Sequence, residues 1–198
     1  MSKKSYPIRI PRYAAGIRAQ EARSGSGRTW WAKRWIHKME SMGLGPRLGR
    51  GKNYAVSGQV ISLAVSGNRV EAKVQGARPD PYLVTLDFRE LPAEAKDRIV
   101  AALKAEPMLV ARLLADDLPL QVEELFRSEG CDFFPGGRLD GVSGRRYDMV
   151  SDCACPDYAN PCKHVTAVLV LLGEEIARRP SLLLELRGIS MEDLCDED

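Results

Sequence analysis

Four residues in the last quarter of the chain have side chains that bind transition metals. They follow the pattern C-x-C-x6-C-x-H and are Cys153, Cys155, Cys162 and His164. Three thiolates and a neutral imidazole are a recognised tetrahedral set for structural zinc, and four protein ligands leave no open position for a substrate. The pattern therefore predicts one structural Zn²⁺ ion and argues against metal-dependent catalysis.

The residues around this pattern indicate how the ligands are presented. The six residues between the two ligand pairs include two prolines, an aspartate and an asparagine, which favour turns. From Cys162 to Ile176 the apolar residues recur at three- and four-residue spacing, which predicts a helix. We expect Cys162 at the entry of this helix, His164 in its first turn, and a strand at 147–151 that delivers Cys153.

A disulfide framework and a redox-active thiol pair are the alternatives for these cysteines. The chain of 198 residues has five cysteines, an odd number, and shows no signal sequence, so disulfides are disfavoured. A reducing, cytoplasmic location is expected instead. Cys195 lies outside the ligand spacing and is expected to be a free thiol.

The pattern and the hydrophobic helix after it resemble the SWIM zinc finger, and the run from Asp152 to Val168 is similar to its bacterial form. The resemblance implies a compact ββα unit of the kind associated with SNF2-type helicases. It also implies that the four ligands carry over as the zinc set. Members of that family are regarded as DNA-binding or protein-interaction modules.

The charge of the chain is distributed unevenly. The net charge is only +2, but residues 1–80 contain sixteen Lys/Arg against four Asp/Glu, a net of +12. Residues 81–198 contain thirteen against twenty-three, a net of −10. A basic half predicts a polyanionic partner. The alternative is that the two halves neutralise each other within the fold.

Three segments make up most of the basic half. Residues 1–28 are predicted to be a flexible basic arm, or a plain solubilising tail. Thr29 and Gly43 would cap a helix over 30–42, whose tryptophan stripe is either core or a base-stacking surface. The Gly- and Arg-rich residues 43–53 are either a clamp on a nucleic-acid backbone or an ordinary connection.

The remaining segments predict a scaffold. Residues 54–88 alternate as a three-strand antiparallel meander whose first strand begins near Val56. Pro92, Pro107 and Pro119 open three helices. Residues 131–148 are expected to form a strand and a loose loop, and a short helix follows Pro180. No apolar run is long enough for a membrane span.

These observations predict an α+β protein that is not an enzyme. Its parts would be the arm at 1–28, an α+β body at 29–140, the ββα finger at 141–188 and an acidic tail at 189–198. We expect a nucleic-acid-binding module, for DNA rather than RNA, with a SNF2-type helicase as partner and no small-molecule substrate. The alternative is a protein-interaction adaptor. The predicted nucleic-acid contacts are Arg28, Lys33, Arg34, Lys38, Arg47, Arg50, Lys52 and Lys163.

Overall fold

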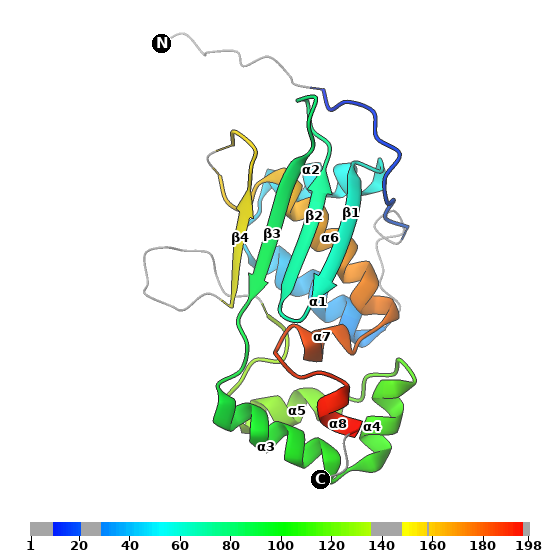
Figure 1. Ribbon diagram of the computed structural model, residues 1–198, viewed down its shortest axis with the longest axis vertical. Helices are drawn as coiled ribbons and strands as arrows, with labels where there is room; N and C mark the ends of the chain where they lie inside the picture. The colour runs from blue at the N-terminus through cyan, green and yellow to red at the C-terminus, as the bar shows by residue number, and fades with distance from the viewer. Residues whose placement is uncertain (1–9, 21–28, 136–147, 158, 196–198) are drawn as a thin grey trace.

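A four-stranded antiparallel sheet forms the centre of the structure (Figure 1), a computed structural model that describes residues 10–20, 29–135, 148–157 and 159–195. The strands lie in the order β1-β2-β3-β4. Their bounds are β1 Val60–Ser66, β2 Arg69–Val74, β3 Tyr82–Phe88 and β4 Met149–Cys153. Helix α6 (Lys163–Arg178) packs on one face of this sheet, and α1 (Trp30–Ser41) and α2 (Pro46–Val56) pack against α6. This architecture confirms the predicted α+β class.

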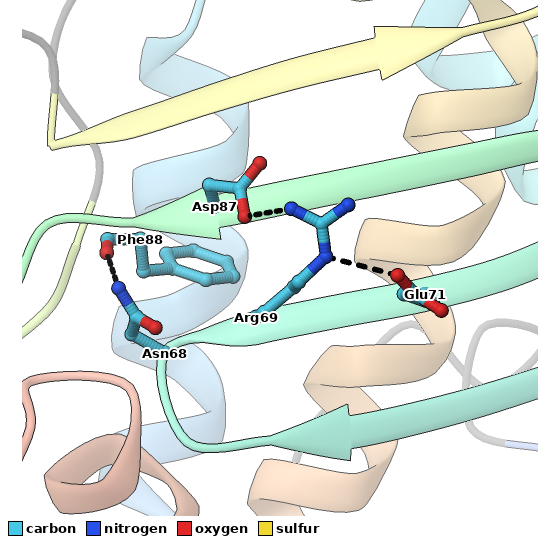
Figure 2. Close-up of polar contacts among 5 residues, drawn as sticks. All are labelled: Asn68, Arg69, Glu71, Asp87 and Phe88. Atoms are coloured by element: carbon cyan, nitrogen blue, oxygen red, sulfur yellow. Dashed lines mark hydrogen bonds and ion pairs between the residues drawn. The ribbon is translucent and has the colours of Figure 1, made fainter.

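The first three strands form the predicted meander. Alternate residues of β2 and β3 are buried, as their sequence pattern indicates. On the exposed face Arg69 donates to Glu71 at 2.9 Å and to Asp87 at 2.6 Å, while the Asn68 amide donates to the Phe88 carbonyl at 2.8 Å (Figure 2). Exposed ion pairs add little stability, so we assign these contacts only a small share of the energy that holds the sheet together.

Strand β4 extends this same sheet. It pairs with β3 in antiparallel register from Phe88↔Met149 to Val84↔Cys153. The strand that delivers Cys153 is therefore joined to the meander across about sixty residues of sequence. Within the described part of the chain, the neighbour of β4 is β3 of the meander.

Helix α6 is the central element of the core. Eleven of its residues are buried, around the whole circumference of the helix, because the sheet covers one side and α1 and α2 cover another. The tryptophan stripe of α1 packs into this core, where the Trp35 indole donates to the Leu169 carbonyl at 3.1 Å. Trp31 and Trp35 are 7% and 1% exposed, which confirms the core alternative and excludes base stacking by these two rings. Thr29 caps α1, as predicted.

The Gly-rich segment 43–53 does not form a loop, because residues 46–53 lie in helix α2. The alternative of an ordinary connection is therefore wrong. Pro46 occupies the first turn of α2, where its missing N–H is not needed, and the helix continues to Val56. Strand β1 consequently begins at Val60 rather than near Val56. One of the glycines that suggested a loop serves helix packing instead, since Gly51 lies directly against Thr166 of α6.

We predict opposite effects of alanine at two glycines of α2. A Cβ at Gly51 would lie 2.4 Å from Thr166 Cγ2, so Gly51→Ala should force the helices apart and cost about 1–3 kcal/mol. A Cβ at Gly49 meets nothing within 4 Å, so Gly49→Ala should stabilise the helix by about 0.5–1 kcal/mol. Urea unfolding of both variants measures the difference, and equal effects would contradict the close packing of α2 on α6.

A second layer of helices lies beyond the end of the sheet (Figure 1). It contains α3 (Ala93–Lys104), α4 (Pro107–Leu114), α5 (Leu120–Ser128) and α8 (Glu192–Cys195), while α7 (Leu182–Glu185) lies between this layer and the sheet. The three helices after prolines are confirmed. None of the helices in the described ranges combines the length and apolar character that crossing a membrane requires.

Arg187 connects the second layer to the sheet. Its side chain is 3% exposed and donates to the carbonyls of Arg89, Asp132 and Phe133, and it also pairs with Asp148 at 3.5 Å. Burial lowers the pKa of this guanidinium. The strand expected to begin near Cys131 is wrong, because residues 131–135 form bends that bury two phenylalanines beside Arg187.

Residues 10–20, which we call the strap, lie within the segment predicted as a basic arm. The strap is bound to α2 and β1 by backbone hydrogen bonds: Ala19 N donates to Ala55 O at 3.0 Å and Ile17 N to Val60 O at 2.7 Å. Gln20 N donates to the buried carboxylate of Glu174 on α6 at 2.9 Å. The strap is therefore held along one side of the body, whereas residues 1–9 and 21–28 lie outside the described residues.

Candidate metal centre

The four predicted ligands come together where β4 ends and α6 begins. Cys153 is the last residue of β4, and Cys155 follows it in the turn. Cys162 is the N-cap residue of α6, with extended backbone, and His164 lies in the first turn of the helix. The predicted positions of Cys162 and His164 relative to the helix are thus confirmed.

The geometry of the cluster suits a single ion. The four ligand atoms all lie within 4.8 Å of one another. His164 Nδ1 is 3.8 Å from Cys153 Sγ and 3.7 Å from Cys162 Sγ. Zinc–ligand bonds of about 2.3 Å to sulfur and 2.1 Å to nitrogen give a tetrahedral edge of about 3.6 Å, close to both distances. The cluster could therefore hold one metal ion, with Nδ1 as the histidine donor.

The thiols compete for ionisation. The hydrogen bond between Cys153 and Cys162 raises the pKa of Cys153 and lowers that of Cys162. Burial raises the pKa of Cys155. Three thiolates this close together repel one another unless a cation lies between them, because the partly buried site screens their charge poorly. A bound cation would remove that repulsion, which is the chemistry expected of a thiolate metal site.

Two tyrosines far apart in the sequence fix the ring of His164. Tyr54 of α2 lies edge-on to the imidazole at 5.2 Å between ring centroids, and Tyr82 of β3 lies at 4.8 Å on a tilted plane. His164 is 3% exposed, and its Nε2 has no hydrogen-bond partner among the described residues. Packing of the two rings orients Nδ1 toward the thiols. Sequence reasoning missed both tyrosines, because only the fold brings α2 and β3 to this point.

Hydrogen bonds hold the turn that carries the ligands. Ser151 Oγ donates to Asn160 Oδ1 at 2.6 Å, and the Asn160 amide donates back to the Ser151 carbonyl. Thr166 Oγ1 donates to the Cys162 carbonyl at 2.9 Å, and Ala154 N donates to the Leu83 carbonyl at 3.1 Å. These hydrogen bonds anchor the turn to β4, β3 and the start of α6.

The residues predicted to contact nucleic acid occupy three helices. Three of them lie on α1, three on α2, and one opens α6, while Arg28 lies outside the described residues. In chain order they are Lys33, Arg34, Lys38, Arg47, Arg50, Lys52 and Lys163. The six residues on α1 and α2 therefore lie on two helices that both pack against α6.

Comparison with known proteins adds one relative. The chain is 38% identical over 188 residues to Uncharacterized protein Rv2102 of Mycobacterium tuberculosis. The match covers 95% of this chain but 65% of the length of that protein. No family model matches the chain. No solved structure matches it.

Proposed function

We propose that the protein is a zinc-dependent, non-catalytic nucleic-acid-binding module built on a SWIM-type finger. Three cysteines and one histidine at tetrahedral spacing favour zinc over the harder cations, which prefer oxygen ligands. The spacing C-x-C-x6-C-x-H, which resembles that of the SWIM finger, supports the assignment of the site to this type of finger. A reducing cytoplasm would keep the three thiols available for the ion.

The nucleic-acid proposal rests on the positive charges of α1 and α2, most of which form no ion pair among the described residues. Among the described residues, the ion pairs of the acidic half are made mostly with arginines of that same half, as in Arg98–Glu129 and Arg112–Asp117. Of the predicted contact residues, Arg34 pairs with Glu123 at 3.1 Å. The others within the described ranges form no ion pair. Most of the positive charge of α1 and α2 is therefore not paired with the acidic half, which supports the proposal of a polyanionic partner.

Lys and Arg side chains on two consecutive helices, α1 and α2, offer several positive charges, which favours phosphates as the ligand. We further propose that the bound nucleic acid is DNA and that the module assists a SNF2-type ATPase, both supported by the family resemblance. A protein-interaction adaptor is the second candidate. Three exposed apolar side chains of the second layer favour it: Met108, Leu114 and Leu120.

We predict that binding weakens steeply as salt rises, and that the basic side chains of α1 and α2 cause this dependence. Replacing Lys33, Lys38 and Arg50 with glutamine should reduce the slope of log affinity against log salt by about 2–3, because each phosphate contact contributes roughly 0.9. Fluorescence anisotropy with a labelled DNA duplex at several salt concentrations measures the slope.

A matched control removes three positive charges from the acidic half, by glutamine at Lys104, Arg112 and Arg127. This control should bind with the affinity and slope of the unaltered protein. Absence of binding to DNA or RNA at low salt would reject the nucleic-acid proposal in favour of the adaptor.

A further inference from the structure

Two cations lie on the aromatic rings that flank the ligand His164. Lys163 Nζ is 5.1 Å from the centre of the Tyr54 ring, and Arg78 Cζ is 6.0 Å from the centre of the Tyr82 ring. Within the described ranges, neither cation forms an ion pair with a carboxylate. We call Lys163 and Arg78, with the two tyrosines beneath them, the cationic rim. Contacts with the ring faces hold both charges in place without neutralising them.

The strap passes next to this rim. Arg12 N donates to the Gly76 carbonyl at 2.9 Å, and the Gln75 side chain donates to the carbonyls of both Gly76 and Arg78. The backbone at Arg12 is therefore tied to the loop that carries Arg78. The next residue, Tyr13, is 83% exposed, so both faces of its ring are open to a ligand.

We propose that the cationic rim and Tyr13 bind a nucleic-acid strand with unpaired bases. Lys163 and Arg78 neutralise phosphates, and Tyr13 stacks on a base. A base stacked inside a duplex has both faces covered, so an exposed tyrosine ring favours a single strand or an unpaired end. This inference rests on the proposed nucleic-acid-binding function. It adds the class of strand and a contact surface at the metal centre, distinct from the basic side chains of α1 and α2.

The rim also gives the metal centre a role in binding. The ion would fix His164, the packed imidazole would position the rings of Tyr54 and Tyr82, and these rings would hold the two cations. Loss of the ion should therefore weaken binding at the rim without removing any contact residue.

The test compares variants of the full, metal-loaded chain. The probes are a labelled DNA strand of about 12 nucleotides and the matching duplex. Tyr13→Ala should weaken binding of the single strand about 5- to 100-fold, the effect of losing one stacked base, and Tyr13→Phe should retain it. The pair Lys163→Gln and Arg78→Gln should reduce the salt slope for the single strand by about 1.4, from two phosphate contacts at roughly 0.7 each.

The control pair Lys104→Gln and Arg112→Gln removes the same charge from the second layer and should leave single-strand affinity unchanged. Zinc content measured on every variant distinguishes a lost contact from a lost ion. If the unaltered protein binds the strand while the Tyr13→Ala and rim variants bind as tightly as the control, the rim inference is overturned and the proposed function stands. If the unaltered protein binds neither probe at low salt, both are overturned.

Discussion

A Cys162→Ser variant is expected to lose its metal ion and to melt about 10–20 °C below the unaltered protein. Structural zinc sites contribute apparent binding free energies of ~10–16 kcal/mol in small peptides, and part of that energy is folding energy. Because this chain also has a large apolar core, we expect a smaller loss, of about 5 kcal/mol. In a protein of this size each kcal/mol shifts the melting temperature by about 2–4 °C.

The position of Cys162 explains why the expected effect is so large. Its thiol is buried at the entry of α6, the helix against which α1, α2 and the sheet all pack. Without the ion, Cys153 and Cys155 would lose their link to the two ligands of α6. This end of β4 would then be held by its pairing with β3, its packing on α6 and the Ser151–Asn160 hydrogen bonds. Differential scanning calorimetry and metal analysis of the same sample measure both losses.

Cys195→Ser is the matched control, because this thiol is exposed and lies outside the cluster. It should keep one metal ion per chain and the melting temperature of the unaltered protein. Equal melting temperatures for the Cys162 and Cys195 variants would refute a structural role for the centre.

A Trp35→Ala variant is expected to lose about 3–5 kcal/mol of unfolding free energy. Trp35 of α1 is 1% exposed and packs against α6 and the sheet. Its ring centroid lies 6.5 Å from that of Phe88 in β3. Gly173 of α6 lies so close to the indole that a Cβ there would be 2.5 Å from the ring. The substitution would leave a large cavity and remove the hydrogen-bond donor of the buried Leu169 carbonyl.

Two further variants separate packing from other effects at Trp35. Trp35→Phe keeps much of the apolar volume and should lose less than Trp35→Ala, whereas Lys33→Ala on the exposed face of α1 should change stability by less than about 0.5 kcal/mol. Guanidinium unfolding monitored by circular dichroism gives all three values. A loss below about 1 kcal/mol for Trp35→Ala would show that this core account of the tryptophan stripe is incorrect.

The features that the sequence predicted correctly depend on residues that are close together along the chain. The ligand pattern, the helix after it, the proline-opened helices and the alternation of β2 all follow from spacings of a few residues. The tryptophan stripe left two alternatives, and burial of Trp35 decided between them. Helix α2 was missed because its glycines, considered locally, indicate a loop, whereas the packing of Gly51 depends on Thr166 in a distant helix.

The surroundings of the metal centre could not be predicted, since they depend on contacts between distant segments. Tyr54, Tyr82 and His164 come from α2, β3 and α6, which meet because α6 packs on both α2 and β3. Cations on tyrosine rings leave no signature in a single sequence. Arg78 was therefore absent from the predicted contacts, although it lies over the ring of Tyr82, which packs on His164.

Removal of the ion from the unaltered protein tests whether the metal centre is structural. We predict that a strong chelator under reducing conditions releases one zinc ion per chain, and that the melting temperature then falls to that of Cys162→Ser. A chain that carries no zinc when purified, or that keeps its melting temperature after complete removal of the ion, would contradict a structural zinc centre.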